Sequence, residues 1–179
     1  MPQKKLVDYK KKRDFSNTSE PQGEISETFC EEIKRKHKGK DLGPRPIYVV
    51  QKHQASRLHF DLRLEFDDVL VSWAVPKEPP TEDNVKRLAI QTEDHPLEYS
   101  LFKGEIPAGN YGAGKVEIWD TGTFDVKEKK KDKIEVIIKG KKLKGRYILL
   151  KTQFAKNSWL FFKTKTKSDE KVEEVEVIG

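Results

Sequence analysis

The sequence predicts a mainly β protein: a closed antiparallel β-barrel of about eight strands, with an N-terminal arm and one or two short helices. Short runs rich in β-branched and aromatic residues recur between positions 47 and 164, and turn-forming stretches separate them. Apolar residues spaced for an amphipathic helix are almost absent from the same region. Short strands at regular spacing are typical of a barrel or a tightly closed sandwich.

Composition limits the kind of protein. The 179 residues suit one domain, and a hydrophobic fraction of 35% beside a charged fraction of 37% requires an economical core. The net charge of +6 favours a polyanionic partner, although solubility alone also explains a basic balance. One cysteine, Cys30, excludes an intramolecular disulfide and a thiolate-rich zinc site. Without a membrane-length apolar run or a signal peptide, we expect a cytoplasmic monomer with no membrane partner.

Three segments are expected along the chain: an N-terminal arm and basic linker over 1–46, a β-barrel domain over 47–165, and a C-terminal tail or edge strand over 166–179. The arm carries apolar residues that a solvated tail would not need, so it is expected to pack across the domain from Leu6 onward; these residues are Leu6, Val7, Tyr9 and Phe15. Thr28 and Glu31 resemble a capping box and predict a helix ending near Lys36. The basic run at 34–40 is expected to be a solvated loop, and its His37 is not expected to bind metal.

The strand predicted at 59–65 organises the site. Polar and apolar residues alternate there, so His59, Asp61, Arg63 and Glu65 share one face while Phe60, Leu62 and Leu64 share the other. A turn at 54–56 would bring His53, at the end of the preceding strand, beside His59. Two imidazoles and a carboxylate suit a divalent ion of intermediate hardness, such as manganese, zinc, cobalt or iron. The alternative for this pattern is a solvated strand face with a salt bridge from Arg63.

Further strands are predicted at 71–75, 87–95, 115–119, 122–127, 134–139, 147–152 and 159–164. Alternation in the second of these would place Arg87, Gln91, Glu93 and His95 on one face. The glycine-rich segment 104–115 is not a phosphate-binding loop, because Lys115 is followed by Val116 and a strand instead of Ser or Thr and a helix. Its glycines are expected to serve tight turns or close backbone approach.

Five motifs together carry a family resemblance. They read QKHxASRLHFDLRLE at 51–65, SWAVPK at 72–77, EDHPLxY at 93–99, IPxGxYGxG at 106–114 and KRDFxxTxEP at 12–21. This set resembles the phosphoesterase module of bacterial DNA ligase D, over roughly residues 6–164. The resemblance implies a small β-barrel hydrolase, dependent on manganese, that heals 3′ ends of DNA or RNA for repair by non-homologous end joining. It implies removal of a terminal 3′-ribonucleoside as a phosphodiesterase and then of the 3′-phosphate as a phosphomonoesterase.

The resemblance also assigns residues. It implies that His53, His59 and Asp61 bind Mn²⁺, with Co²⁺ or Zn²⁺ as alternatives, and that Arg63 and His95 hold the substrate phosphate. The other active-site positions that it implies are Gln51, Lys77, Arg87, Glu93 and Tyr99, and the substrate-binding positions in the arm are Arg13, Asp14 and Glu20. Glu78 departs from the glycine usual after the Pro-Lys pair, and a carboxylate there would weaken a phosphate contact of Lys77.

The implied partners are primer-template ends with a 3′-ribonucleotide or 3′-phosphate, and a separate DNA ligase, polymerase or Ku-like protein, because the chain is expected to be a free-standing phosphoesterase. The chemistry of the residues agrees. The guanidinium of Arg63 matches two phosphate oxygens, and a histidine at position 95 with an ordinary pKa of about 6.5 could give a proton to a leaving oxygen. The attacking group is left open between water, a ribose 2′-hydroxyl and a histidine.

Two other functions fit part of the pattern. A non-haem iron(II) oxygenase would use His59, Asp61 and a distant histidine as a facial triad. A non-catalytic nucleic-acid-binding barrel would place lysines and arginines on phosphates and aromatic residues on bases. Neither accounts for the whole run of motifs.

Overall fold

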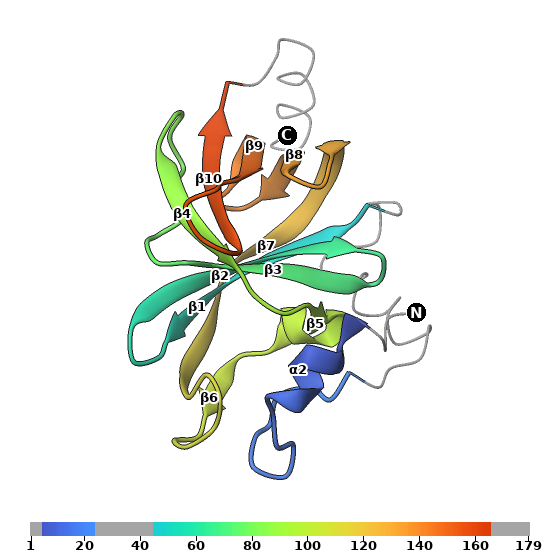
Figure 1. The fold of residues 1–179 in the computed structure, drawn as a ribbon, viewed down its shortest axis with the longest axis vertical. Helices are drawn as coiled ribbons and strands as arrows, with labels where there is room; N and C mark the ends of the chain where they lie inside the picture. Colours follow the sequence, from blue (N-terminus) through green and yellow to red (C-terminus); the bar gives the residue numbers. More distant parts are fainter. Residues whose placement is uncertain (1–4, 24–44, 166–179) are drawn as a thin grey trace.

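The computed structural model describes residues 5–23 and 45–165, and its main body is a closed antiparallel barrel of eight strands (Figure 1). The ring runs in the order β1-β2-β3-β4-β10-β9-β8-β7 and closes through pairing of β7 with β1. The eight strands are β1 (Ile47–Gln54), β2 (Leu58–Phe66), β3 (Val69–Val75), β4 (Lys86–Gln91), β7 (Gly114–Lys129), β8 (Lys133–Gly140), β9 (Lys144–Lys151) and β10 (Ser158–Thr164). The predicted fold class is confirmed.

The hairpin of β1 and β2 has the predicted register, with His53 directly opposite His59 and Gln51 opposite Asp61. The apolar residues of β2 belong to the cluster that fills the barrel, together with Tyr48 and Val50 of β1. Since side chains alternate across a strand, Gln51 and His53 of β1 and His59, Asp61 and Arg63 of β2 lie on the outer wall of the barrel. The site is therefore built on the outside of the barrel, on the opposite face of the sheet from the main core.

A second hydrophobic cluster covers that outer wall. It joins Leu6 and Tyr9 of the arm to residues of β1, β3 and the 3₁₀ helix η1 (Leu97–Leu101). Tyr9 lies in the short helix α2 (Val7–Lys11), which packs below the barrel beside η1 (Figure 1). Leu6 and Tyr9 are buried and Phe15 packs against the same cluster, as predicted, whereas Val7 stays exposed. The arm is thus a structural part of the outer wall.

The prediction of one strand over 87–95 is wrong. Strand β4 ends at Gln91, and a separate two-residue strand, β5 (His95–Pro96), follows. The reason is that β3 changes partner along its length: Trp73 and Ala74 pair with β4, while Val69 and Leu70 pair with β5. The chain at 92–94 leaves the ladder between them, so Arg87 is not in phase with His95.

The two strands predicted at 115–119 and 122–127 form one long strand, β7. Its first half pairs with β1 and its second half with β8, so no turn is needed near position 120. Asp120 stays in the strand because its buried carboxylate accepts hydrogen bonds from three backbone N–H groups of the β8–β9 turn, those of Lys141, Lys142 and Leu143. A short edge strand, β6 (Gly104–Ile106), pairs with the beginning of β7.

Close backbone approach was the predicted role of the glycines in 104–115, and Gly114 confirms it. A side chain there would meet the Gln54 carbonyl oxygen at 2.1 Å, and its φ of 140° disfavours other residues. Several predictions lie outside the described residues: the helix after Thr28, the basic loop at 34–40 with its His37, and the tail at 166–179. The division into three segments stays a prediction. In the part of the chain that is described, no helix is long and apolar enough to span a membrane.

Candidate active site

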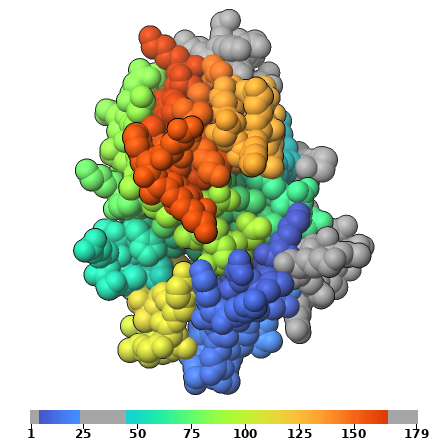
Figure 2. Space-filling view, viewed as in Figure 1, coloured from blue at the N-terminus to red at the C-terminus, as the bar shows by residue number. Residues whose placement is uncertain are grey.

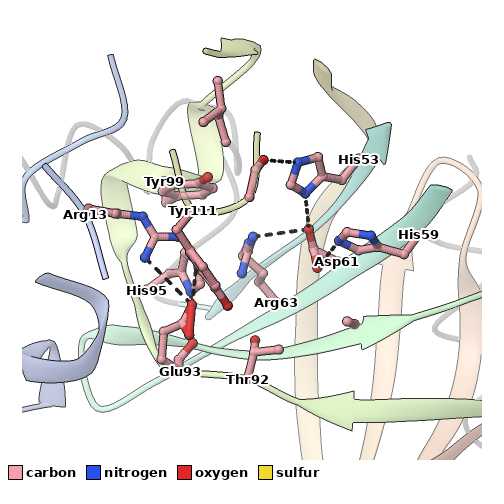
Figure 3. Close-up of a pocket in the computed structure, with 13 residues that line it drawn as sticks. Arg13, His53, His59, Asp61, Arg63, Thr92, Glu93, His95, Tyr99 and Tyr111 are labelled. Carbon is pink, nitrogen blue, oxygen red and sulfur yellow. Dashed lines mark hydrogen bonds and ion pairs between the residues drawn. The ribbon is translucent and has the colours of Figure 1, made fainter. Parts of the chain in front are cut away.

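A cavity of about 260 Å³ opens on the outer wall of the barrel, between the β1–β2 hairpin, the arm and the loop that joins β6 to β7 (Figure 3). It brings together eight of the residues predicted for the site, from segments far apart in the sequence. They are Arg13, His53, His59, Asp61, Arg63, Glu93, His95 and Tyr99, and the remaining lining residues are Ala74, Thr92, Ile106, Tyr111 and Gly112.

At one end of the cavity, His53, His59 and Asp61 form a cluster whose possible ligand atoms all lie within 4.8 Å of one another. Nδ1 of His53 is 3.5 Å from one carboxylate oxygen of Asp61, and Nε2 of His59 is 3.3 Å from the other. Each of the three residues offers one ligand atom toward a common point. The cluster can hold a divalent metal ion, with two nitrogens and an oxygen as donors.

Hydrogen bonds on the far side of each imidazole fix which nitrogen faces the cluster. Nε2 of His53 donates to the Gly112 carbonyl at 2.6 Å, and Nδ1 of His59 donates to the Arg57 carbonyl at 3.2 Å. Carbonyl oxygens only accept, so those two nitrogens carry protons, and the other nitrogen of each ring faces Asp61 and is the one available to a metal ion. Metal-binding histidines commonly have such an outer hydrogen bond. The residues present therefore fit a metal ion.

The charged groups around the cluster also favour metal binding there. Burial alone would raise the pKa of Asp61, but the positive charge of Arg63 and hydrogen bonds from both histidines outweigh it and hold that pKa well below its usual range. For His59, burial lowers the pKa, yet the hydrogen bond and negative charge of Asp61 raise it overall. Metal binding at the cluster then competes with protonation of His59.

Next to the cluster, Arg63 is buried and held by its neighbours. Nε donates to Oε1 of Gln51 at 2.7 Å, and Nε2 of Gln51 donates to the carbonyls of Tyr99 and Phe102 at 2.7 and 3.0 Å. Nη2 lies 3.6 Å from Asp61, and the Tyr99 ring lies 4.8 Å from the guanidinium carbon. Nη1 is buried and has no hydrogen-bond partner among the described residues. A buried donor of this kind calls for an acceptor, and an anion in the cavity would supply one.

The arm adds a second guanidinium, that of Arg13, whose side chain is only 5% exposed. Its Nε donates to Glu20 at 2.9 Å, and the same carboxylate oxygen accepts from the hydroxyl of Tyr99 at 2.7 Å. Nη2 lies 3.3 Å from Nε2 of His95, and Nη1 lies 3.7 Å from Glu93. Glu20 does not line the cavity but fixes two side chains that do.

His95 is a neutral imidazole in this setting. Nδ1 donates to the Glu93 carbonyl at 2.9 Å, so Nε2 is left to accept from Arg13. Burial lowers the pKa of His95, and the positive charges of Arg63 and Arg13 lower it further, well below 6.5. The expectation of an ordinary pKa is therefore wrong. The ring cannot donate a proton from Nε2 until negative charge enters the cavity.

Besides Gln51 and Glu20, which contact lining residues directly, three predicted residues lie outside the cavity lining. Lys77 is exposed beyond the end of β3, and Arg87 donates from Nε to the Glu78 carbonyl at 2.9 Å on that same loop. Asp14 is exposed and accepts hydrogen bonds from Ser16 and Asn17, which shape the turn after α2. The structure thus separates these residues from the metal-ligand cluster, and their implied roles stay predictions.

Tyr111 and Gly112 were not placed at the site by the sequence analysis. Both belong to the motif at 106–114, but glycine spacing alone does not show which backbone carbonyl or ring will face a pocket. Their position depends on the long connection between β6 and β7, which turns back over the β1–β2 hairpin.

These features define a closed β-barrel that carries, in one outer cavity, residues able to hold a metal ion and two buried guanidinium groups able to bind an anion. The chain belongs to the family described as the DNA ligase D 3′-phosphoesterase domain, which matches residues 51–151. The matched range begins in β1 and ends with β9, and it includes His53, His59, Asp61, Arg63 and His95.

Curated relatives cover nearly the whole chain. The multifunctional non-homologous end joining DNA repair protein LigD of Mycobacterium tuberculosis is 42% identical over 172 residues, which are 94% of this chain and 21% of that protein. The multifunctional non-homologous end joining protein LigD of Pseudomonas aeruginosa is 44% identical over 176 residues, 95% of this chain and 20% of its own length. The chain thus spans about a fifth of the length of these relatives.

Proposed function

We propose that the protein is a Mn²⁺-dependent 3′-phosphoesterase that heals the 3′ ends of DNA or RNA. It would remove a terminal 3′-ribonucleoside as a phosphodiesterase and then the remaining 3′-phosphate as a phosphomonoesterase, leaving a 3′-hydroxyl for ligation. One observation carries the proposal. The His-His-Asp cluster shares its cavity with Arg63, whose buried Nη1 has no hydrogen-bond partner among the described residues.

Residues at different points along the cavity would have different roles. His53, His59 and Asp61 would hold the ion, which supplies a Lewis acid for a phosphoryl oxygen when bound. Arg63 would bind the phosphate through Nη1 and Nη2, because Gln51 already occupies Nε. Arg13 would bind a second oxygen and shift away from His95. Donors fixed before the substrate arrives stabilise developing charge at little reorganisation cost.

His95 has a role that depends on the bound phosphate. In the free site its neutral Nε2 accepts from Arg13. A phosphate dianion offsets the two guanidinium charges, so it raises the tendency of His95 to take up a proton. The protonated ring would then donate to a phosphate or leaving-group oxygen, with its other N–H still held by Glu93. Proton uptake at His95 would thereby accompany substrate binding.

Residues outside the cavity would contact the rest of the nucleic acid. Lys77 and Arg87 would bind backbone phosphates, because Lys77 is exposed beyond β3 and the guanidinium of Arg87 contacts the same loop at Glu78. Asp14 would act on the substrate only through the turn it shapes in the arm. A DNA ligase, polymerase or Ku-like protein would act on the same ends.

Both other predicted functions receive less support. The distant histidine of an oxygenase triad would be His95, yet the metal-ligand cluster in the described residues uses His53 instead. A non-catalytic barrel would not need Arg63, Arg13 and His95 buried around a cavity. Membership of a 3′-phosphoesterase family also favours catalysis.

A primer-template with a single 3′-terminal ribonucleotide tests the proposal. Purified protein with Mn²⁺ should convert it first to a 3′-phosphate and then to a 3′-hydroxyl, and EDTA should abolish both products. Parallel reactions with Co²⁺, Zn²⁺ or Fe²⁺ identify the ion, and an iron oxygenase would show turnover only with Fe²⁺ and oxygen. Binding without any change in end chemistry under all four ions would refute the proposal.

A further inference from the structure

Tyr111 lines the cavity but is 47% exposed, unlike the buried aromatic residues behind it. In Figure 3 its side chain runs between Tyr99 and Glu93, beside Arg63. Tyr111 is therefore the aromatic side chain of this cavity that a substrate can meet from outside.

The backbone around Tyr111 is fixed on both sides. The backbone carbonyl of Gly112 accepts the hydrogen bond from His53, and the backbone N–H of Asn110 donates to the Pro107 carbonyl at 3.2 Å. The side-chain amide of Asn110 also donates to the Asn17 carbonyl of the arm at 3.4 Å. Figure 2 shows this loop and the arm side by side on one surface. A ring on such a support keeps its position without needing to be buried.

Cations of the arm lie near the same ring. Nζ of Lys12 is 5.0 Å and the guanidinium carbon of Arg13 is 5.3 Å from its centroid. Lys12 also pairs with Glu93 at 2.6 Å, so it is held at the cavity mouth. A half-exposed aromatic ring beside fixed cations is the combination that binds a base next to a phosphate.

We infer that Tyr111 is a specificity-determining residue: its ring stacks on the base of the 3′-terminal nucleoside while the adjoining phosphate lies between Arg63 and the metal-ligand cluster. The inference rests on the proposed function, because it takes the same cavity as the site of the 3′ end. Stacking on an aromatic ring tolerates any base, so the residue selects for a terminal base without selecting its identity.

Two ends that differ only in the terminal base test the inference. The first is a primer-template ending in a 3′-ribonucleotide, and the second ends in a ribose without a base. Dissociation constants measured with EDTA, which prevents turnover, should show the wild type preferring the first by about 5- to 150-fold, the range for loss of one stacked base. Tyr111→Ala should bind both ends equally, and Tyr111→Phe should keep most of the preference.

A spectroscopic readout supports the same comparison. A terminal 2-aminopurine should lose fluorescence on binding to the wild type and to Tyr111→Phe, but not on binding to Tyr111→Ala. A wild type that neither prefers the base nor quenches the probe overturns the inference, whether or not the alanine variant folds. Equal weakening of binding to both ends in Tyr111→Ala also overturns the inference, because Tyr111 would then only support the structure of its loop.

The test of base stacking by Tyr111 can succeed or fail independently of the test of the proposed reaction. Loss of the base preference in Tyr111→Ala supports the stacking role through binding alone. Absence of Mn²⁺-dependent cleavage in the wild type overturns the proposed reaction whatever the binding data show.

Discussion

Gln51 fixes the guanidinium of Arg63 in a single orientation: Oε1 of Gln51 accepts from Nε of Arg63 at 2.7 Å, while its amide nitrogen is anchored to two backbone carbonyls. The two residues lie on neighbouring strands, and both are buried. The consequence is that the guanidinium is held at the cavity lining before any substrate arrives, with Nη2 near Asp61. Several tests of the site follow from this kind of prior positioning.

Replacing Arg63 should affect chemistry more than binding. Arg63→Ala should lower kcat by about a hundredfold or more, the usual cost of losing one electrostatic donor to the transition state. Arg63→Lys should recover little, because an ammonium group cannot bond Gln51 and two phosphate oxygens in a fixed plane. Steady-state kinetics on a 3′-phosphate end measure both variants.

The control for the Arg63 variants replaces lysines of the basic run at 34–40, which is not predicted to take part in the reaction. Replacing Lys34, Lys36 and Lys38 together should weaken binding modestly and flatten its salt dependence while sparing kcat. The opposite pattern, with kcat lost in the triple variant and kept in Arg63→Ala, would show that β2 does not carry the reaction.

The metal-ligand cluster predicts loss of metal binding on removal of one donor. His59→Ala should weaken Mn²⁺ binding strongly, because only one imidazole and one carboxylate remain of the three ligands. Free Mn²⁺ is measured by electron paramagnetic resonance, and His37→Ala is the matched control. Wild-type affinity in His59→Ala would remove this cluster as the metal site.

His95 predicts a pH dependence of stability. Its folded pKa lies well below its value of about 6.5 in the unfolded chain, so between the two values the unfolded chain binds more protons. Stability should therefore rise with pH up to about 6.5 and level off above it. Urea unfolding between pH 5 and 7 with EDTA should show a shallower slope for His95→Gln, by up to about 1.4 kcal/mol per pH unit. Equal slopes for the variant and the wild type would contradict the assignment.

The contacts of Glu20 predict that the folding of the arm and the structure of the cavity depend on each other. Its buried carboxylate binds both Arg13 and the hydroxyl of Tyr99, so Glu20→Gln leaves a buried guanidinium without its closest counter-charge. Breaking such a pair costs about 3–5 kcal/mol of folding stability, and kcat should fall with it. Asp8→Asn, on the exposed side of the same arm, is the control and should change neither. An unchanged melting temperature in Glu20→Gln would show that the arm is not held through this residue.

Gly109 in the β6–β7 loop and Gly114 at the beginning of β7 separate the cost of an unfavourable backbone conformation from the cost of a steric clash. Both have positive φ, but a side chain at Gly109 would meet nothing within 4 Å, whereas one at Gly114 would meet the Gln54 carbonyl. Gly109→Ala should cost about 1–2 kcal/mol for its conformation alone, and Gly114→Ala should cost clearly more. Chemical denaturation of both variants measures the difference. Equal costs would mean that the loop moves away from β1 easily.

The sequence by itself determined the barrel class and the core of the site. Strict alternation in β2 and a short turn place His53 opposite His59, because strand geometry and hairpin closure are local properties. The same alternation puts Asp61 and Arg63 on the outer face. These positions do not depend on contacts with distant parts of the chain, so the pattern of about fifteen consecutive residues is enough to predict them.

Only the tertiary structure decided what covers that face. Packing of the arm against β1, β3 and η1 buries Arg13 beside His95, and burial and the guanidinium charge favour the neutral imidazole. The change of partner along β3 ends β4 early and leaves Arg87 outside the cavity, and the β6–β7 loop brings in Tyr111. Strand pairing and burial depend on residues far apart in the chain, so local sequence patterns do not reveal them. The protonation state of His95 and the position of Tyr111 depend on the residues that pack around them.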